Sequence, residues 1–347
     1  MKDFDYSLLQ AKKWDSDLLN YVGQIAEDKG RQELFLSRKP AVLDSLVELA
    51  IVQSTESSNR IEGIRTSDSR LKDLVLKKVT PQDRDEEEIL GYQDVLSTIH
   101  ESYQYIAITP QVILQLHRDL FKYSERSIGG RFKNTQNYIS ETSGDGATFV
   151  RFTPLDPFST PAAMTEICDA FNRAIDADVL HPLILIPVFI HDFLCIHPFN
   201  DGNGRMSRLL TTLLLYKSGY VVGRYISLEE KIERTKMAYY KALEESGHGW
   251  HEGQDDPSPF IRYILATVLA AYRDFEDRVN LFEPAESALD QVRRVVNRRV
   301  GKFTKRDIME IIPMIGRASI ENSLTALVEE GLLERHGKGR GTFYTRK

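Results

Sequence analysis

Cysteine is scarce in this sequence. The 347 residues include only two cysteines, Cys168 and Cys195, so a disulfide framework and a cysteine-based zinc site are both excluded. So few cysteines are typical of proteins that work in a reducing compartment. The first residues, MKDFDYSLLQAKKWDSD, also lack the apolar core of a signal peptide. We therefore expect a cytoplasmic protein.

A long hydrophobic run is missing as well. The most apolar stretch, 183–195, is too short to cross a bilayer. Pro187, His191 and Asp192 interrupt it. The stretch therefore predicts a buried helix, in which His191 and Asp192 make polar contacts in the core. We expect no association with a membrane.

Neither sign of charge is in large excess. The net charge of -6 argues against a nucleic-acid-binding protein when the chain is taken as a whole. Hydrophobic residues make up 41% of the sequence, so a sizeable core can form. The length of 347 residues suits two or three domains.

What the sequence does contain is helical periodicity along most of its length. Apolar spacing, acidic starts, Thr and Pro caps and terminal glycines predict helices over 40–63, 85–103, 109–123, 161–177, 182–195, 205–218, 227–246 and 260–280. One segment differs, because NYISETSGDGATFVRFTP has two β-prone runs around Ser143–Gly146 and predicts a hairpin. Residues 247–259 are rich in Gly, Asp and Pro and predict a loop.

The last 63 residues have a different character. Residues 285–347 hold 13 Lys and Arg against 8 Asp and Glu, a charge of +5, which leaves -6 - 5 = -11 on the rest. Two helical stretches, FTKRDIMEII and ASIENSLTALVEEG, precede two short strands around Gly337–Gly341. A helix-turn-helix followed by a hairpin predicts a small winged helix-turn-helix domain.

The most informative stretch is IHPFNDGNGRMSRLL, residues 196–210, in which a polar loop separates two apolar helices. The start of the second helix presents unpaired N–H groups, which attract phosphate. Gly202 and Gly204 let backbone amides approach an anion, and Asn203 adds a side-chain donor. The loop therefore predicts an anion-binding site.

Charged and titratable residues flank this loop. Arg205 and Arg208 are three residues apart, so we expect them on one helix face and directed to one region. Asp201 is a hard oxygen ligand suited to magnesium, and His197 can accept a proton near neutral pH. A base, a metal ligand and an anion site indicate phosphoryl or nucleotidyl transfer. No GxxxxGK[ST] motif is present, so the site is not a P-loop.

HPFNDGNGRMSR resembles the signature of the Fic family, His-x-Phe-x-Asp/Glu-Gly-Asn-Gly-Arg-x-x-Arg, at every fixed position. The resemblance implies a mainly α fold with an all-helical Fic core and a β-hairpin flap. It also implies a protein adenylyltransferase, which moves AMP from ATP to a Ser, Thr or Tyr hydroxyl of a target protein, or of itself. By this resemblance His197 is the base and Asp201 holds Mg²⁺. The residues that bind the ATP phosphates are Asn200, Gly202, Asn203, Gly204, Arg205 and Arg208.

A second motif, Ser58-x-x-x-Glu62-Gly63, resembles the inhibitory motif of Fic proteins and ends a predicted inhibitory helix at about 43–63. A glutamate there would pair with Arg208 in a bidentate fashion and exclude the γ-phosphate. We therefore expect self-inhibition by Glu62. Whether the glutamate acts within one chain or across a dimer stays open.

Two further sets of residues resemble parts of a Fic site. Tyr239, Tyr240 and Leu243 are similar to adenine-pocket residues, on a helix after the signature. Tyr138 and Ile139 belong to the predicted hairpin, which resembles the flap that pairs with a target strand.

These observations divide the chain into a helical region with the inhibitory helix (1–105), a Fic catalytic domain (106–282) and a winged helix-turn-helix domain (283–347). Two other functions stay open: removal of AMP by the same site, and a nucleotide-sensing transcription regulator that acts through the winged helix. ATP and a target protein are the expected partners, and a homodimer is left open. DNA binding is not favoured, because ASIENSLTALVEEG is itself acidic.

Overall fold

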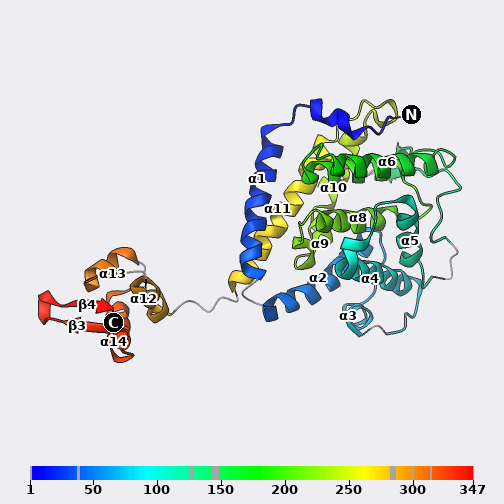
Figure 1. Ribbon diagram of the computed structural model, residues 1–347. Helices are drawn as coiled ribbons and strands as arrows, with labels where there is room; N and C mark the ends of the chain where they lie inside the picture. Colours follow the sequence, from blue (N-terminus) through cyan, green and yellow to red (C-terminus); the bar gives the residue numbers. More distant parts are fainter. Residues whose placement is uncertain are drawn as a thin grey trace. The chain divides into compact units, whose positions relative to one another are not determined.

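The computed structural model shows two compact units, Met1–Asp277 and Arg278–Lys347 (Figure 1). The structure describes residues 2–36, 40–77, 79–124, 128–142, 148–281, 287–297, 301–312 and 315–346. The predicted hairpin turn, Ser143–Gly146, and the predicted domain boundary at residue 283 lie outside these ranges. The predicted N-terminal helical region and nearly all of the predicted catalytic domain, up to Asp277, belong to one unit.

The larger unit is mainly helical, which confirms the predicted fold class. Its helices are α1 (Ser16–Leu36), α2 (Pro40–Ile61), α3 (Asp68–Lys77), α4 (Arg84–Ser102), α5 (Pro110–Leu120), α6 (Thr160–Asp176), α7 (Pro182–Ile196), α8 (Asn203–Lys217), α9 (Leu228–Arg234), α10 (Lys236–Gly247) and α11 (Ser258–Leu281). The predicted hairpin is present as β1 (Ile139–Thr142) and β2 (Thr148–Phe152), which pair antiparallel.

Helices α7 and α8 form the centre of this unit. Almost every residue of α7 is buried, including both polar ones, and so is α8 up to Tyr216. Helix α7 packs on α6 and α8, while α8 also contacts α2 and α4 (Figure 1). A helix that is apolar on all sides must be covered on all sides. The polar loop between α7 and α8 is therefore held by two fully packed helices.

Several helix ends follow the local sequence closely. The Thr109 hydroxyl accepts a hydrogen bond from the backbone N–H of Val112, and Pro110 occupies the first turn of α5. The Asp83 carboxylate accepts from the N–H of Glu86 at the start of α4. Helix α2 ends at Ile61, and Gly63 follows with a φ of 84°. The glycine permits this left-handed turn directly after Glu62.

One prediction about the later helices was wrong. The stretch 227–246 forms two helices, α9 and α10, which are separated at Thr235 (φ -115°, ψ 27°). The Thr235 hydroxyl bonds to the carbonyl of Lys231, a local bond that competes with helix continuation. The predicted loop 247–259 contains a 3-10 turn, Trp250–Glu252, whose tryptophan is 1% exposed.

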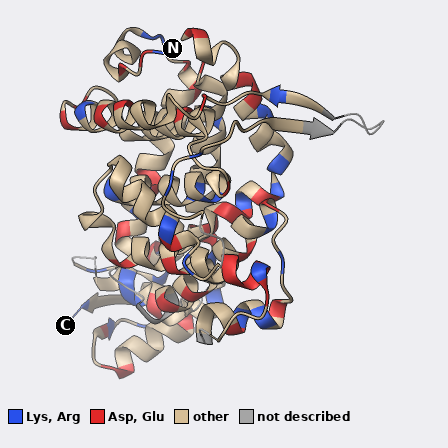
Figure 2. Ribbon diagram, turned by 90° about the vertical axis from the view of Figure 1, so that its right-hand side faces the viewer, with Lys and Arg blue, Asp and Glu red and all other residues tan. Residues whose placement is uncertain are grey.

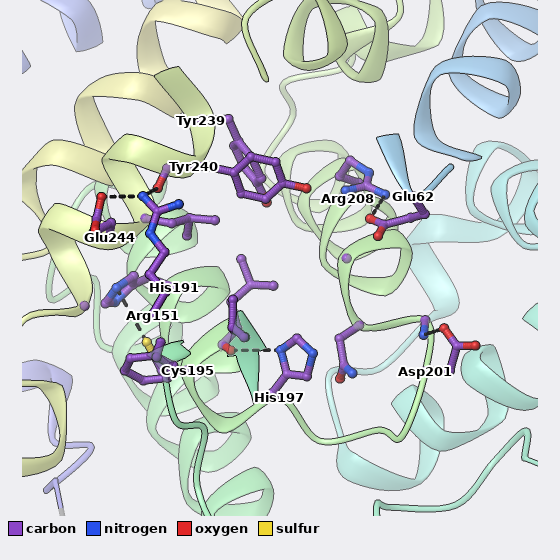
Figure 3. Close-up of a pocket in the computed structure, with 18 of the residues that line it drawn as sticks. Glu62, Arg151, His191, Cys195, His197, Asp201, Arg208, Tyr239, Tyr240 and Glu244 are labelled. Atoms are coloured by element: carbon purple, nitrogen blue, oxygen red, sulfur yellow. Dashed lines mark hydrogen bonds and ion pairs between the residues drawn. The ribbon is translucent and has the colours of Figure 1, made fainter. Parts of the chain in front are cut away.

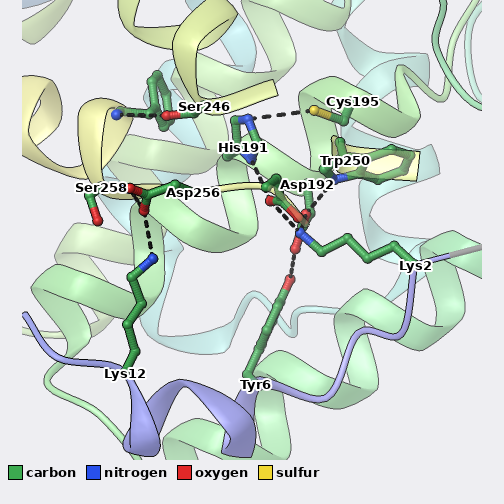
Figure 4. Close-up of polar contacts among 12 residues, drawn as sticks. Lys2, Tyr6, Lys12, His191, Asp192, Cys195, Ser246, Trp250, Asp256 and Ser258 are labelled. Atoms are coloured by element: carbon green, nitrogen blue, oxygen red, sulfur yellow. Dashed lines mark hydrogen bonds and ion pairs between the residues drawn. The ribbon is translucent and has the colours of Figure 1, made fainter. Parts of the chain in front are cut away.

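The N-terminal residues are attached to the end of α7, which the sequence did not indicate. The Lys2 ammonium lies 2.8 Å from Asp192 Oδ1 and 2.7 Å from Asp255 Oδ2, and the Tyr6 hydroxyl donates to Asp192 Oδ2 at 2.9 Å (Figure 4). Trp250 Nε1 donates to the same carboxylate at 2.7 Å. Asp192 thus makes the polar core contacts expected of it, and a chain end is fixed in place.

The smaller unit consists of α12 (Ala288–Asn297), α13 (Lys305–Ile311), α14 (Arg317–Glu329), β3 (Leu333–His336) and β4 (Phe343–Arg346). Strands β3 and β4 pair antiparallel, and Phe303 bridges to Tyr344 of β4. Helix α12 was not predicted; Val292 and Val296 bury it in the core of this unit. The remaining order agrees with the expected helix-turn-helix and hairpin, and the winged-helix assignment stays a prediction.

Acidic and basic residues are interspersed along the helices of the larger unit (Figure 2). Among the helices that the structure describes, none is both long and apolar enough to cross a membrane.

Candidate active site

His197 ends α7 in an unusual backbone conformation. Its φ is 52° and its ψ 63°, in the left-handed region that favours glycine. Its backbone N–H donates to the carbonyl of Phe193 at 2.9 Å. Its ring Nδ1 lies 3.3 Å from the carbonyl oxygen of Leu194. A carbonyl can only accept, so Nδ1 carries the proton and Nε2 is the basic nitrogen.

Burial keeps this imidazole neutral. It lowers the pKa of His197 to about 4, with Lys133 acting in the same direction and the Leu194 carbonyl and Glu62 opposing it. At pH 7 the ring therefore has a lone pair on Nε2 available to accept a proton.

The loop after His197 is shaped by Asn203. The Asn203 side chain accepts from the N–H of Phe199 at 2.9 Å and donates to the carbonyl of the same residue at 2.7 Å. We expected this amide to contact an anion, but it closes the loop. Gly202, with a φ of 83°, then begins α8. A glycine is required at position 202 because of this positive φ and because the Phe121 ring would collide with a Cβ atom.

A cavity of about 350 Å³ lies against this loop. It brings together most of the predicted site residues: Glu62, Ile139, His197, Asn200, Asp201, Gly202, Asn203, Gly204, Arg208, Tyr239, Tyr240 and Leu243. Of the other predicted residues, Ser58, Gly63, Tyr138 and Arg205 are not among its lining. Figure 3 shows Tyr239 and Tyr240 between the Arg151–Glu244 pair and Arg208. Residues from five separate segments of the chain thus share one space.

Arg208 is held by the end of α2. Its Nη2 lies 2.8 Å from Glu62 Oε1 and 2.9 Å from the Ser58 carbonyl, while its Nε donates to Ser58 Oγ at 2.8 Å. The guanidinium is 3% exposed. The ion pair between Glu62 and Arg208, predicted to be bidentate, is instead made through one carboxylate oxygen. Ser58 accepts two further hydrogen bonds from the same guanidinium. All three residues belong to the same chain.

The Glu62 carboxylate rests on the first turn of α8. A Cβ atom at position 204 would overlap Glu62 Oε1, so only glycine allows this approach. Burial by itself would raise the pKa of Glu62, but Arg208, with Arg205 and Lys236, lowers it below its ordinary value. An anion therefore occupies the helix N-terminus beside Arg208.

Arg205 does not point to the same region as Arg208, contrary to the expectation from their spacing. Its Nη2 lies 2.7 Å from Glu88 Oε2, and its guanidinium covers the Phe121 ring. It is 1% exposed, and its Nε and Nη1 have no hydrogen-bond partner among the described residues. Glu88 was missed, because nothing in the acidic start of α4 distinguishes it from its neighbours.

Asp201 lies at the rim of the cavity, with 39% of its side chain exposed. Its Oδ1 accepts from the N–H of Gly202 at 2.7 Å, and Arg205 and Arg84 approach its two oxygens at 3.7 and 3.9 Å. A carboxylate in this position is a suitable ligand for a Mg²⁺ ion that also binds substrate phosphates.

The other end of the cavity is more apolar. Tyr239 is 3% exposed, and Tyr240 packs against it with 5.4 Å between ring centroids. Arg151 of β2 pairs with Glu244 of α10, a contact that the sequence did not reveal. Ile139 of the hairpin lines the cavity, whereas Tyr138 is 61% exposed. The hairpin thus covers the cavity through β1 and β2.

Residues 107–215 match the Fic/DOC family. The chain contains a Fic domain. The segment 107–215 begins before α5 and ends within α8, so it includes the signature loop and the hairpin but not Glu62 or the tyrosines of α10.

Curated relatives of the Fic domain are named protein adenylyltransferase Fic. The protein from Nematostella vectensis is 25% identical over 269 residues, which are 74% of this chain and 55% of the relative. The protein from Drosophila erecta is 31% identical over 181 residues, which are 51% of this chain and 31% of the relative. The chain thus spans about half or less of these relatives.

Solved structures share the fold of this chain. A crystal structure of a Fic family protein from Desulfovibrio desulfuricans has a TM-score of 0.62 at 20% identity and covers 97% of each chain. A Fic domain containing signaling protein from Bacteroides thetaiotaomicron has a TM-score of 0.61 at 22% identity, over 76% of this chain and 98% of its own.

The pairing of Glu62 predicts a pH-dependent stability. Its pKa is lower in the folded protein, so its contribution is fully present above the unfolded value of about 4.3 and is lost as pH falls through the folded value. Glu62→Gln should therefore unfold more easily than wild type at pH 7, and the difference should shrink below about pH 4.5. Denaturant unfolding followed by Trp14 and Trp250, both in the larger unit, measures it.

Glu48→Gln is the matched control, because Glu48 is exposed on the same helix. It should change the free energy of unfolding little at any pH. A Glu62→Gln deficit that is independent of pH would contradict the ion-pair origin of this stability.

Proposed function

We propose that this Fic protein is a protein adenylyltransferase that transfers AMP from ATP to a Ser, Thr or Tyr hydroxyl of a target protein or of itself, and that Glu62 inhibits it. The observation that carries the proposal is the position of the Glu62 carboxylate. It lies on the glycine-lined start of α8 and on Arg208, where a phosphate group would bind.

The competition between carboxylate and phosphate explains the inhibition. Arg208 is buried and needs an anionic partner, and Glu62 supplies one from the same chain. A γ-phosphate would require the same donor, so only one of the two anions can be bound. With Glu62 in place, ATP would lack its γ-phosphate contact, and its α-phosphate would not be aligned for transfer.

The chemical step uses the neutral ring of His197. Nε2 accepts the proton of the target hydroxyl while that oxygen attacks the α-phosphorus. A new bond forms between oxygen and α-phosphorus, the bond from the α-phosphorus to its bridging oxygen breaks, and pyrophosphate leaves. The start of α8 and Arg208 stabilise the phosphate charge. Arg205 pairs with Glu88 outside the lining of the cavity, so we propose no contact between Arg205 and this anion.

Magnesium is part of the proposal, and Asp201 would hold it. The donor set fits, because a single carboxylate with substrate phosphates and water is the usual magnesium ligation. Bound Mg²⁺ would neutralise charge on the phosphates of ATP. Tyr239, Tyr240 and Leu243 would enclose the adenine ring at the more apolar end of the cavity.

Glu62→Gly should transfer AMP faster than wild type, because Arg208 becomes free for ATP. Arg208→Ala removes the anchor of both anions, so it should stay slow alone and combined with Glu62→Gly. Initial rates with α-³²P-ATP, measured as self-modification and on lysate proteins, test this. If Glu62→Gly is no faster than wild type on any acceptor, Glu62 is not an inhibitor.

His197→Ala, made in the Glu62→Gly protein, should lose transfer by about 10²- to 10⁴-fold, the usual contribution of a general base. His336→Ala, in the smaller unit, is the control and should keep the parental rate. Circular dichroism verifies that both variants are folded. A rate within a few-fold of the parent would show that another group accepts the proton.

Asp201→Asn, in the same background, should reduce transfer roughly tenfold or more and raise the Mg²⁺ concentration needed for half-maximal rate. Asp169→Asn, exposed on α6, is the control with an equal change of charge. An unchanged Mg²⁺ titration would place the metal on other ligands.

A further inference from the structure

The residues on either side of His197, Ile196 and Pro198, are both bound by one residue, Lys133, from the segment before the hairpin. The Lys133 ammonium donates to the carbonyl of Ile196 at 2.8 Å, directly before His197. The Lys133 backbone N–H donates to the carbonyl of Pro198 at 2.8 Å, directly after it. The left-handed residue is thus fixed on both sides by the same neighbour.

This arrangement has an energetic cost on both partners. Lys133 is 3% exposed, which is rare for a lysine, and burial lowers the pKa of its ammonium to about 8. His197 has a φ of 52°, a left-handed conformation that is strained for a residue other than glycine. Such strain persists when the surroundings determine the backbone, and it is concentrated at functional sites.

Lys133 lies outside the lining of the cavity. Its ammonium and backbone N–H are instead bonded to the carbonyls of the residues next to His197. We infer that Lys133 is a positioning residue for the catalytic base, holding the two carbonyls that flank His197 so that the imidazole faces the cavity. This inference rests on the adenylyltransferase function proposed above.

Lys133 also acts on His197 through its charge. The charged groups that act on the imidazole are Lys133 and Glu62, and the Leu194 carbonyl accepts its hydrogen bond. Asp156 in turn acts on the Lys133 ammonium. Lys133 lowers the pKa of the ring and Glu62 raises it. A variant without the ammonium should therefore bind a proton on His197 at higher pH than the parent does.

The test uses the Glu62→Gly protein as parent. Lys133→Met keeps the apolar stem and removes the donor and the charge. We expect kcat for AMP transfer to fall by about 100-fold, the cost of a base displaced by about 1 Å, with KM for ATP within about threefold of the parent. Lys133→Arg, which keeps a cationic donor, should recover most of this loss. Lys217→Met is the control, because Lys217 also donates to backbone carbonyls, those of Tyr103 and Gln104, away from the cavity.

A second readout is the acid limb of the pH–rate profile. Because neutral His197 is the active form, the rate falls as pH drops through its pKa. Lys133→Met should move this limb to higher pH, and Lys217→Met should not. The titration of the His197 ring by NMR, identified by its loss in His197→Ala, gives the same shift without activity.

Two results would overturn the inference. One is a kcat for Lys133→Met equal to that of the parent. The other is a lower kcat for Lys133→Met with an unmoved acid limb, together with full loss of activity in Lys133→Arg. Lys133→Gln covers the case in which methionine is not tolerated, with an expected loss of about tenfold or more. If the parent itself transfers no AMP, the proposed function fails, and the NMR titration alone then tests the role of Lys133. An unchanged pKa of the His197 ring in folded Lys133→Met or Lys133→Gln overturns that role.

Discussion

The arrangement of the larger unit depends on one buried positive charge. Arg208 is 3% exposed, and a guanidinium in that position must be paired, because an uncompensated buried charge costs about 3–5 kcal/mol. Ser58 and Glu62 satisfy it in this structure. An anionic ligand can replace Glu62 only by supplying an equivalent charge. Under the proposed function, the same requirement would keep the site closed and would make it receptive to phosphate.

The end of α2 is held by α9 and α10, and α10 also lines the more apolar end of the cavity. Lys236, at the start of α10, donates to the carbonyl of Ile61 at 2.7 Å, and Arg60 reaches Glu233 of α9 at 3.3 Å. Tyr240, one turn further along α10, lines the cavity. A single short helix, α10, thus contacts the residue before Glu62 and also carries the tyrosines of the cavity.

The parts of the site that could be predicted from the sequence are those formed by residues that are close together along the chain. His197 to Arg208 form a continuous loop and helix start, whose glycines and charges can be read without a fold. Glu88 and Lys133 contact the same loop from distant segments, and neither their type nor their spacing marks them. The break at Thr235 has no Gly or Pro, so helical periodicity concealed it. The sequence thus predicted local chemistry, and tertiary packing supplied the support around it.

The attachment of the N-terminus has a consequence for the order in which the protein forms on the ribosome. The Lys2 ammonium binds carboxylates 190 and 253 residues further along the chain. Synthesis proceeds towards the C-terminus at about 5–20 residues per second, so the segment that contains Lys2 waits more than about ten seconds before Asp255 exists. Its apolar Phe4 and Tyr6, both buried in the finished protein, are exposed throughout that time. In a nascent chain, residues 2–6 therefore lack these partners until most of the larger unit has been synthesised, and chaperones that recognise short aromatic segments would be able to bind them.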